Sequence, residues 1–144
     1  MRIHGASGRS KLGYVNAYLM CANPNINAPI RLYVDTGASR TTIADRDALR
    51  LGIDYGQLEE SQSPVIGIGC TRIKNYLLRD VLVVFRVSEN SFHIERLPIV
   101  TVLKHEPRND SERAIVDQCP SLLGIDLLEK YGVRFTAKKV ILEK

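Results

Sequence analysis

The sequence predicts an all-β domain, built either as a barrel or as a sandwich. Short stretches rich in β-branched and aromatic residues recur along the chain, and turn residues such as Gly, Pro, Asn and Asp separate them. Only two segments have the pattern of a helix, and both are short. Strands and helices do not alternate regularly, which argues against a doubly wound parallel sheet, and no internal repeat is present.

The expected elements follow in order from an N-terminal arm. Residues 1–13 are rich in glycine, serine and basic residues and are expected to be a flexible arm or a poorly ordered first strand, which leaves one folded domain over residues 14–144. A first helix is expected to start at Asp45, which can cap it, and to end at Leu51-Gly52. A second helix is expected over residues 125–131, and segment 104–118 is expected to be a surface loop with at most one helical turn. The expected strands are 14–20, 29–34, 41–43, 64–66, 73–78, 81–87, 92–94, 97–103, 133–135 and 140–142.

Composition and charge exclude several classes of protein. The 144 residues suffice for one domain with its own core, and 44% apolar with 25% charged residues is typical of a globular protein rather than a disordered one. The net charge of +4 is modest and the basic residues are scattered, so no nucleic-acid surface is expected. Charges interrupt every apolar run before the ~18 residues of a membrane span, and no signal peptide opens the chain. A cytoplasmic protein without a membrane partner is therefore expected.

The cysteines and histidines give no sign of a disulfide framework or a metal site. Cys21, Cys70 and Cys119 lie far apart and include no Cys-x-x-Cys pair. The histidines at 4, 93 and 105 also lack the spacing of metal ligands. No metal is expected.

The most informative segment is Asp35-Thr36-Gly37, which follows the strand-like run 30–34 and precedes Ala38-Ser39. The run delivers a carboxylate, a hydroxyl and a residue without a side chain into a tight turn. Aspartic-protease chemistry uses this combination but requires two carboxylates, and the chain has one such turn. Asp54-Tyr55-Gly56 is not a second one, because it follows the end of a helix and Tyr cannot replace the small hydroxyl residue. The chain therefore either works as a symmetric dimer or is not this kind of enzyme.

Three further features make the triplet more specific than a turn alone. The β-branched run Thr41-Thr42-Ile43 follows it closely. Further downstream, the strands expected at 64–66 and 73–78 flank Gly67-Ile68-Gly69, which is the pattern of a hairpin with a glycine-rich tip. An ordinary hairpin with a glycine bulge gives the same pattern. Near the C-terminus, Leu122-Leu123 precede Gly124 at the start of the second expected helix.

With these features in this order, the chain resembles the retropepsin-like aspartic proteases, the single-domain family of retroviral proteases and their cellular relatives. The resemblance covers roughly residues 14–142. Residues 38–43 look closer to cellular members than to viral ones. Viral members typically carry an acidic residue where Ser39 stands and an arginine where Ile125 stands, and those two form an ion pair. Both are absent here, which allows a dimer but not one built on that pair.

The resemblance implies a closed β-barrel with two short helices and a flap hairpin near residues 64–78. It implies a catalytic dyad of Asp35 from two subunits, with Thr36 bonded across the two-fold axis and Gly37 facing the substrate backbone. Leu123 and Gly124 are then expected to pack beneath the active-site turn, and Asp126 is expected to be structural. The substrate-binding residues that the resemblance implies are Ala38, Ser39, Ile66, Gly67, Ile68 and Gly69.

The expected function is that of a homodimeric aspartic endopeptidase, which cleaves extended, mostly apolar peptide segments without a metal or an organic cofactor. The alternative is a non-catalytic barrel of the same fold that serves as a dimerisation or peptide-binding module. A relative without activity would be expected to lose the carboxylate or the hydroxyl, and both are present in Asp35-Thr36, so the enzyme is favoured.

The chain termini offer a second open choice. In retropepsins the termini of two subunits form an intermolecular sheet. Residues 140–142, or Ile3, could supply a strand of that kind or an internal strand of the barrel, and the sequence favours neither.

Overall fold

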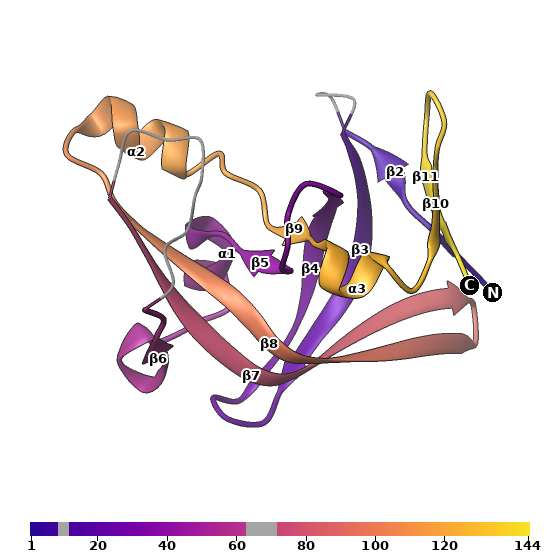
Figure 1. The fold of residues 1–144 in the computed structure, drawn as a ribbon, viewed down its shortest axis with the longest axis horizontal. Coiled ribbons are helices and arrows are strands. Elements are labelled where there is room, and N and C mark those ends of the chain that lie inside the picture. Colours follow the sequence, from indigo (N-terminus) through magenta and orange to yellow (C-terminus); the bar gives the residue numbers. More distant parts are fainter. Residues whose placement is uncertain (9–11, 63–71) are drawn as a thin grey trace.

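The computed structural model describes residues 1–8, 12–62 and 72–144, and its main body is a closed β-barrel (Figure 1). Six strands pair in the order β3, β4, β9, β5, β8 and β7, and a further pairing of β3 with β7 closes the ring. The strands are β3 (Gly13–Cys21), β4 (Ile26–Val34), β5 (Thr42–Ile43), β7 (Arg72–Ser88), β8 (Ser91–Glu106) and β9 (Leu122–Leu123). The all-β prediction is confirmed, and the architecture is a barrel rather than a sandwich.

Alternating burial along the strands produces the core of the barrel. Val15 and Leu19 on β3 are fully buried, and the residues between them on the other face of the strand are more exposed. This period of two is the one that a strand needs when one face packs on a core and the other faces water. Leu32 on β4 and Phe85 on β7 are also fully buried and belong to the same cluster of apolar side chains.

Strands β7 and β8 form one long hairpin along the lower side of the molecule in Figure 1. The sequence predicted four shorter strands in place of these two, and that division is wrong. β7 continues through Asp80, which has a φ of 54°. Aspartate adopts this left-handed conformation more readily than most residues do, so the backbone changes direction locally while the pairing with β8 continues on both sides.

A smaller sheet joins the two ends of the chain beside the barrel (Figure 1). Its antiparallel strands lie in the order β1 (Arg2–His4), β11 (Val140–Glu143) and β10 (Gly132–Phe135). Within the described part of residues 1–13, the chain forms paired strands in place of a loose arm. Burial of Ile3 and backbone pairing with β11 hold β1 in place, and β2 (Ala6–Ser7) pairs with β3.

Strand β11 has a neighbour from its own chain on each side, β1 and β10. Ile3 and Leu142 face each other across β1 and β11, and both are buried. Of the two alternatives for residues 140–142, the internal strand is therefore the one observed, although it lies in the smaller sheet and not in the barrel.

The described residues include three α-helices and one 3₁₀ helix: α1 (Asp45–Arg50), η1 (Tyr55–Gln57), α2 (Asp110–Val116) and α3 (Ile125–Leu128). Helices α1 and α3 confirm the two that were predicted. α1 ends at Arg50, directly before the predicted stop at Leu51-Gly52, whereas α3 ends at Leu128, earlier than expected. Helix α2 replaces the middle of the predicted surface loop, and the Asn109 side chain caps it by accepting the Glu112 backbone N–H at 2.9 Å. None of the described helices is long and apolar enough to cross a membrane.

The predicted capping role of Asp45 is wrong. Ala44 occupies the cap position of α1 and makes no side-chain cap bond. The Asp45 carboxylate instead accepts the backbone N–H of His105 at 2.7 Å and lies 2.6 Å from the Nδ1 atom of the same residue. A contact with β8 thus takes the place of a bond within the helix.

Strand β6 (Glu59–Glu60), which precedes the predicted flap in the sequence, pairs with Tyr76 and Leu77 of β7. Residues 73–78, expected to be the second arm of the flap hairpin, form part of β7. The predicted first arm at 64–66 and the tip, Gly67-Ile68-Gly69, lie outside the described residues.

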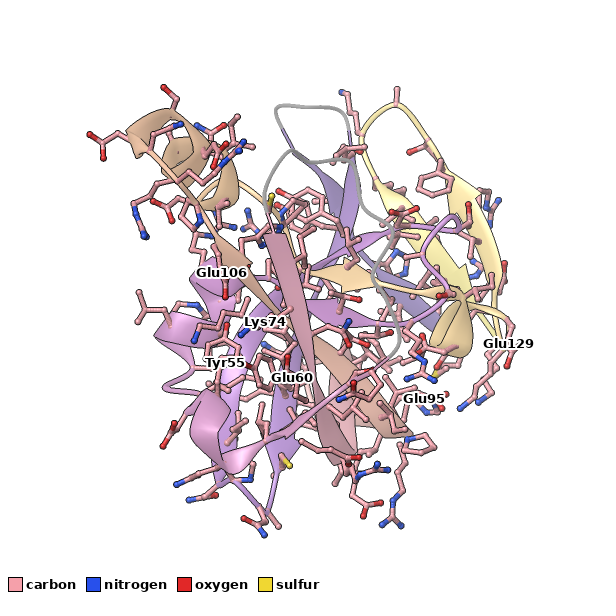
Figure 2. The ribbon with its side chains drawn as sticks, turned by 60° about the vertical axis from the view of Figure 1, so that its left-hand side comes forward. Tyr55, Glu60, Lys74, Glu95, Glu106 and Glu129 are labelled. Carbon is pink, nitrogen blue, oxygen red and sulfur yellow. The ribbon has the colours of Figure 1, made fainter. Side chains whose placement is uncertain are left out.

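Aromatic and charged side chains from η1, β7 and β8 form a cluster (Figure 2). Lys74 and Glu106, from the neighbouring strands β7 and β8, form an ion pair of 3.5 Å. The rings of Tyr55 and Tyr76 pack with their centroids 5.0 Å apart, and the Tyr55 hydroxyl donates a hydrogen bond to the Leu103 carbonyl at 2.7 Å. Burial, together with the nearby Asp45 carboxylate, raises the pKa of Tyr55 to about 12, so its hydroxyl remains a donor at neutral pH.

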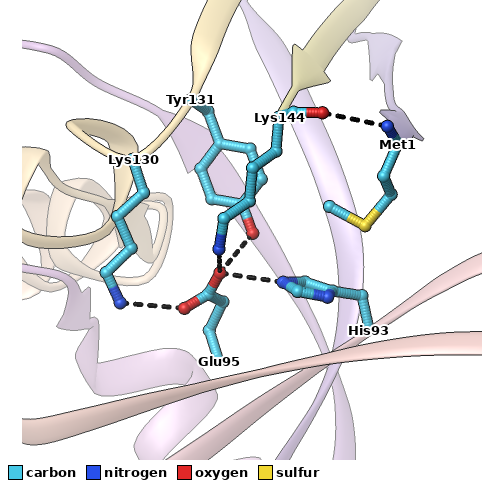
Figure 3. A network of polar contacts seen from close by, with 6 residues as sticks. All are labelled: Met1, His93, Glu95, Lys130, Tyr131 and Lys144. Carbon is cyan, nitrogen blue, oxygen red and sulfur yellow. Dashed lines mark hydrogen bonds and ion pairs between the residues drawn. The ribbon is translucent and has the colours of Figure 1, made fainter.

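A second polar network centres on Glu95, which is 5% exposed on the inner side of β8 (Figure 3). Its carboxylate accepts hydrogen bonds from Tyr131 at 2.6 Å, Lys130 at 2.8 Å and Lys144 at 3.0 Å, and it lies 2.8 Å from Nε2 of His93. Burial alone would raise the pKa of Glu95, but these four partners outweigh it and hold the pKa well below its ordinary range. The network joins β8 to the segment after α3 and to the C-terminal residue.

Candidate active site

Asp35 lies at the point where β4 leaves the barrel wall. The strand ends with the buried residue Val34, and Asp35 is the first residue beyond it. Asp35 is half-buried, whereas Thr36 and Gly37 are exposed. The buried strand β4 therefore ends where the carboxylate reaches the surface of the single chain.

The Asp35 side chain folds back on its own turn. Its Oδ1 atom accepts the backbone N–H of Gly37 at 2.8 Å, and its backbone carbonyl accepts the N–H of Ala38 at 3.2 Å. This is the local bonding that makes aspartate and glycine favourable in turns. Among the described residues the Oδ2 atom has no hydrogen-bond partner. One carboxylate oxygen is thus held in place, and the other is available to another molecule.

Strand β9 and Ile125 hold the backbone of the turn in place through hydrogen bonds. β9 runs parallel to the end of β4, and the N–H of Asp35 donates to the carbonyl of Leu123 at 3.1 Å. The N–H of Ile125 donates to the carbonyl of Ala38 at 2.8 Å on the other side of the turn. Leu123 is fully buried, so the support beneath Asp35 is part of the core.

Gly124 is glycine because the backbone of the turn segment passes directly over it. A Cβ atom there would lie 2.3 Å from the carbonyl carbon of Arg40 and 2.7 Å from the backbone nitrogen of Thr41. Real Cβ atoms essentially never approach other heavy atoms this closely. The N–H of Gly124 donates to Oγ1 of Thr41 at 3.1 Å, so the close approach also forms a hydrogen bond.

Asp126 continues the same set of contacts. Its Oδ1 atom accepts the Thr41 hydroxyl at 2.8 Å, and both of its carboxylate oxygens lie 3.0 Å from the Thr41 backbone nitrogen. These bonds confirm the structural interpretation of Asp126, and they involve a specific partner as well as the start of α3. Thr41 is completely buried and links Gly124 to Asp126 through one hydroxyl group.

A second buried polar group behind the turn connects it to α1. The Ser121 hydroxyl donates to Oδ2 of Asp47 at 2.6 Å and accepts the backbone N–H of Ala44 at 3.0 Å. Ser121 also accepts the N–H of Tyr33 through its backbone carbonyl at 2.9 Å. Thr41, Asp47 and Ser121 were not predicted as supporting residues, because a buried hydroxyl or carboxylate beside a turn leaves little trace in one sequence.

The other predicted site residues divide into three groups. Ala38 and Ser39 continue the turn, with Ala38 half-buried and Ser39 exposed. Leu123 and Gly124 contact the backbone of the turn segment. The residues predicted for the flap, Ile66, Gly67, Ile68 and Gly69, lie outside the described residues.

Asp54-Tyr55-Gly56 has the same local turn in a different setting. The Asp54 side chain accepts the Gly56 N–H at 2.9 Å, just as Asp35 accepts that of Gly37. Asp54, however, caps the 3₁₀ helix η1 on the surface and does not follow a buried strand. This position agrees with its rejection as a second catalytic turn.

Chemically, the site offers one carboxylate, a neighbouring hydroxyl and an exposed glycine backbone on a fixed turn. Such a carboxylate can act as a general base or acid toward a water molecule if a second acid group shares its proton. Among the described residues no group of three or more His, Cys, Asp or Glu side chains is arranged to hold a metal ion.

Comparison with known proteins agrees with this geometry. The profile of a family described as aspartyl protease matches residues 22–127, which include the Asp35 turn, β9 and most of α3. A search of curated proteins gives no significant match. Sixteen chains of solved structures match significantly, among them the crystal structure of a retropepsin-like aspartic protease from Rickettsia conorii. That match has a TM-score of 0.55 and 24% sequence identity, and it covers 99% of this chain and 89% of the other.

The family profile spans well over half of the chain, and the solved structure confirms the barrel as retropepsin-like. The chain therefore belongs to the aspartyl protease family, and it is an aspartic-type peptidase with a retropepsin-like fold.

Proposed function

We propose that the protein is a homodimeric aspartic endopeptidase in which Asp35 of each subunit supplies half of the catalytic dyad. The observation that carries this proposal is the Asp35 turn itself. One carboxylate oxygen is held by the Gly37 N–H, the other has no partner among the described residues, and the core fixes the backbone from below. The chain has one Asp-Thr-Gly turn, so an identical turn from a second copy would complete the pair across a two-fold axis.

Two carboxylates about 3 Å apart cannot both be ionised, so the pair holds one proton in common. In the proposed reaction the ionised Asp35 takes a proton from water as the water oxygen bonds to the carbonyl carbon of the peptide. The protonated Asp35 of the other subunit gives its proton to the carbonyl oxygen. The tetrahedral intermediate then loses its C–N bond, and the leaving nitrogen takes a proton from the protonated carboxyl group of the dyad. The ionised carboxylate takes the proton of one hydroxyl group as a carbonyl forms in the new carboxyl group, so the dyad again holds one proton.

The neighbouring residues have proposed roles that follow from their positions. Thr36 is exposed beside Asp35 and would bond to the partner's backbone, which would hold the two turns in register. Gly37 would present its carbonyl to the substrate backbone. Both backbone groups of Ala38 are bonded within the chain, to Asp35 and Ile125, so its contribution to substrate contact would be its methyl group.

An extended peptide would lie between the two turns and a flap from each subunit. Ser39 would line the same wall as Ala38, and the segment that contains Ile66, Gly67, Ile68 and Gly69 would close over the peptide and exclude bulk water. The substrate class that fits is an extended, mostly apolar segment of a peptide or protein, and the proposed reaction uses no metal and no organic cofactor.

The test compares the wild type with Asp35→Asn and Asp54→Asn on a peptide library and on a denatured protein, between pH 3 and pH 8. Asp54 is the matched control, because it accepts a turn N–H in the same way but caps a surface 3₁₀ helix. We expect cleavage by the wild type and by Asp54→Asn, and none above background by Asp35→Asn. Sedimentation of the wild type at micromolar concentration should show a dimer. Equal cleavage by Asp35→Asn, or a strict monomer that remains active, would reject the proposal.

A further inference from the structure

We propose that a hollow beside the catalytic turn is a subsite for an acidic side chain of the substrate, and that Arg40 is the residue that selects it. This inference rests on the proposed endopeptidase function and specifies its substrate further. The hollow has a volume of about 430 Å³ and lies between Arg40, which follows the turn by two residues, strand β8, and Asp126 and Lys130 in and after α3.

Three cationic side chains line the hollow, from three separate parts of the chain: Arg40, Arg96 and Lys130. The remaining wall is mainly the apolar stretch 97–99 of β8. Asp126 also lines it, but its carboxylate is bonded to Thr41. Cationic groups next to apolar side chains suit a substrate side chain that has methylene groups and ends in a carboxylate.

The three cations are not equally available. Lys130 is 2.8 Å from the buried Glu95 carboxylate, and Arg96 is 3.1 Å from Asp80, so both have partners within the chain. Among the described residues, the Arg40 guanidinium has neither an ion-pair nor a hydrogen-bond partner. It is the cation of this group that can bind an incoming carboxylate without breaking an existing contact.

The distance to the proposed chemistry fits a substrate subsite. Asp35 and Ala38 are the first and last residues of a turn closed by the Ala38 N–H, which places their Cα atoms within about 7 Å of each other. Two further trans peptide steps to Arg40 add at most about 7.6 Å. An extended peptide advances about 3.3 Å per residue, so Arg40 lies within four or five substrate residues of the scissile bond.

Backbone contacts keep Arg40 beside the turn. Its carbonyl carbon would lie 2.3 Å from a Cβ on Gly124, and its carbonyl oxygen accepts the Thr42 hydroxyl at 3.0 Å. The guanidinium therefore extends from a fixed point, and its planar group can bind a carboxylate through two hydrogen bonds.

The test uses pairs of peptides that differ by Glu or Gln at one position within five residues of the cleaved bond. For the wild type, kcat/KM should be about tenfold or more higher for the Glu member at one of these positions. Arg40→Ala should abolish this preference, and Arg40→Lys should retain part of it. Arg40→Glu should instead favour a third peptide that carries Lys at the same position. Arg46→Ala is the control, because Arg46 is an exposed residue of α1 that does not line the hollow.

Binding of the same peptides to the Asp35→Asn variant, measured by fluorescence anisotropy, keeps this test separate from the test of catalysis. A Glu preference in binding to Asp35→Asn that disappears in the double variant Asp35→Asn/Arg40→Ala supports the subsite, even if the wild type cleaves none of the peptides. In that case the endopeptidase proposal fails and the subsite stands. Equal binding of Glu and Gln peptides, or a preference that survives Arg40→Ala, would overturn the subsite.

Discussion

Gly124 and Arg40 lie so close that a Cβ on Gly124 would stand 2.3 Å from the carbonyl carbon of Arg40 and 2.5 Å from its carbonyl oxygen. The two residues are far apart in the sequence, and their contact presses the segment after the Asp35 turn against the start of α3. The neighbouring atoms are backbone, so no side chain can move aside to make room. The geometry of the site is therefore sensitive to substitution even at a residue that carries no functional group.

Gly124→Ala should separate the turn segment from α3. The added methyl would force a backbone shift, and overpacking of this kind costs about 1–3 kcal/mol or more in the free energy of unfolding. We expect a lower midpoint in urea unfolding and a loss of peptidase activity that exceeds the loss of folded protein. Gly132→Ala is the control, because the nearest atom to its new Cβ is 3.6 Å away and no left-handed backbone is involved. Wild-type stability and activity in Gly124→Ala would contradict the expectation.

Thr41→Val should destabilise the same contact by removing one hydroxyl group. The Thr41 hydroxyl donates to Asp126 and accepts from the N–H of Gly124, and Val would leave that buried N–H without a partner. An unsatisfied buried group of this kind costs about 1–3 kcal/mol. Thr41→Ser keeps the hydroxyl and should lose less than half as much stability. The measurement is urea unfolding at pH 7, and equal losses in the two variants would show that the hydroxyl contributes nothing.

The local parts of the site could be predicted from the sequence. Asp35-Thr36-Gly37 follows a run of strand-forming residues, and the turn that forms there depends only on bonds within a few residues. Leu123 and Gly124 were also predictable, since two large apolar residues before a glycine indicate a buried strand that enters a helix. For these residues the information lies in neighbouring positions.

The long-range parts could not be predicted. Thr41 and Asp126 are separated by 85 positions, and the sequence contains no sign that one accepts a hydrogen bond from the other. Asp45 illustrates the same limit, because its position at a helix start predicts a cap, whereas the fold brings His105 within 2.6 Å and the carboxylate binds there. Tertiary contacts replaced a local preference in both cases.

The failure to predict helix α2 has a different cause, because a local signal for this helix exists in the sequence. Asn109 is followed three positions later by Glu112, which is a pattern of helix N-termini, and the structure forms the corresponding cap. The charged composition and Pro107 favoured a loop instead. The predicted strands 73–78 and 81–87 left a break between them, whereas β7 continues through Asp80.

Mixtures of wild type and Asp35→Asn should lose activity faster than the wild-type fraction falls. If each active site needs Asp35 from two subunits, only dimers of two wild-type chains are active, and their share varies with the square of the wild-type fraction. In an equal mixture that has fully exchanged subunits, about one quarter of the activity should remain, compared with about one half for independent monomers. A mixture with Asp54→Asn, the matched turn variant, should keep full activity. A linear decrease with Asp35→Asn would contradict a shared site.

Glu95 should make the fold sensitive to acid. Its pKa in the folded state lies below its ordinary value of 4.5, so the charged form stabilises the fold at higher pH. This contribution is complete above about pH 4.5 and is lost as the pH falls below it toward the lowered pKa. Glu95→Gln should lose about 1–3 kcal/mol at pH 7, because the carboxylate no longer accepts from Tyr131 and the two lysines.

The same variant distinguishes the contribution of the Glu95 carboxylate to acid sensitivity from the contributions of the other carboxylates. Thermal unfolding of the wild type followed by circular dichroism should show a Tm that falls from pH 5 to pH 3, and the fall should be smaller in Glu95→Gln. Glu129→Gln, an exposed residue next to Lys130 and visible in Figure 2, should behave as the wild type. If Glu95→Gln and the wild type lose Tm in parallel below pH 4.5, the network in Figure 3 does not hold a charged carboxylate. Peptidase activity should be measured at each pH alongside Tm, so that a loss of activity caused by unfolding is not mistaken for an effect on the catalytic step.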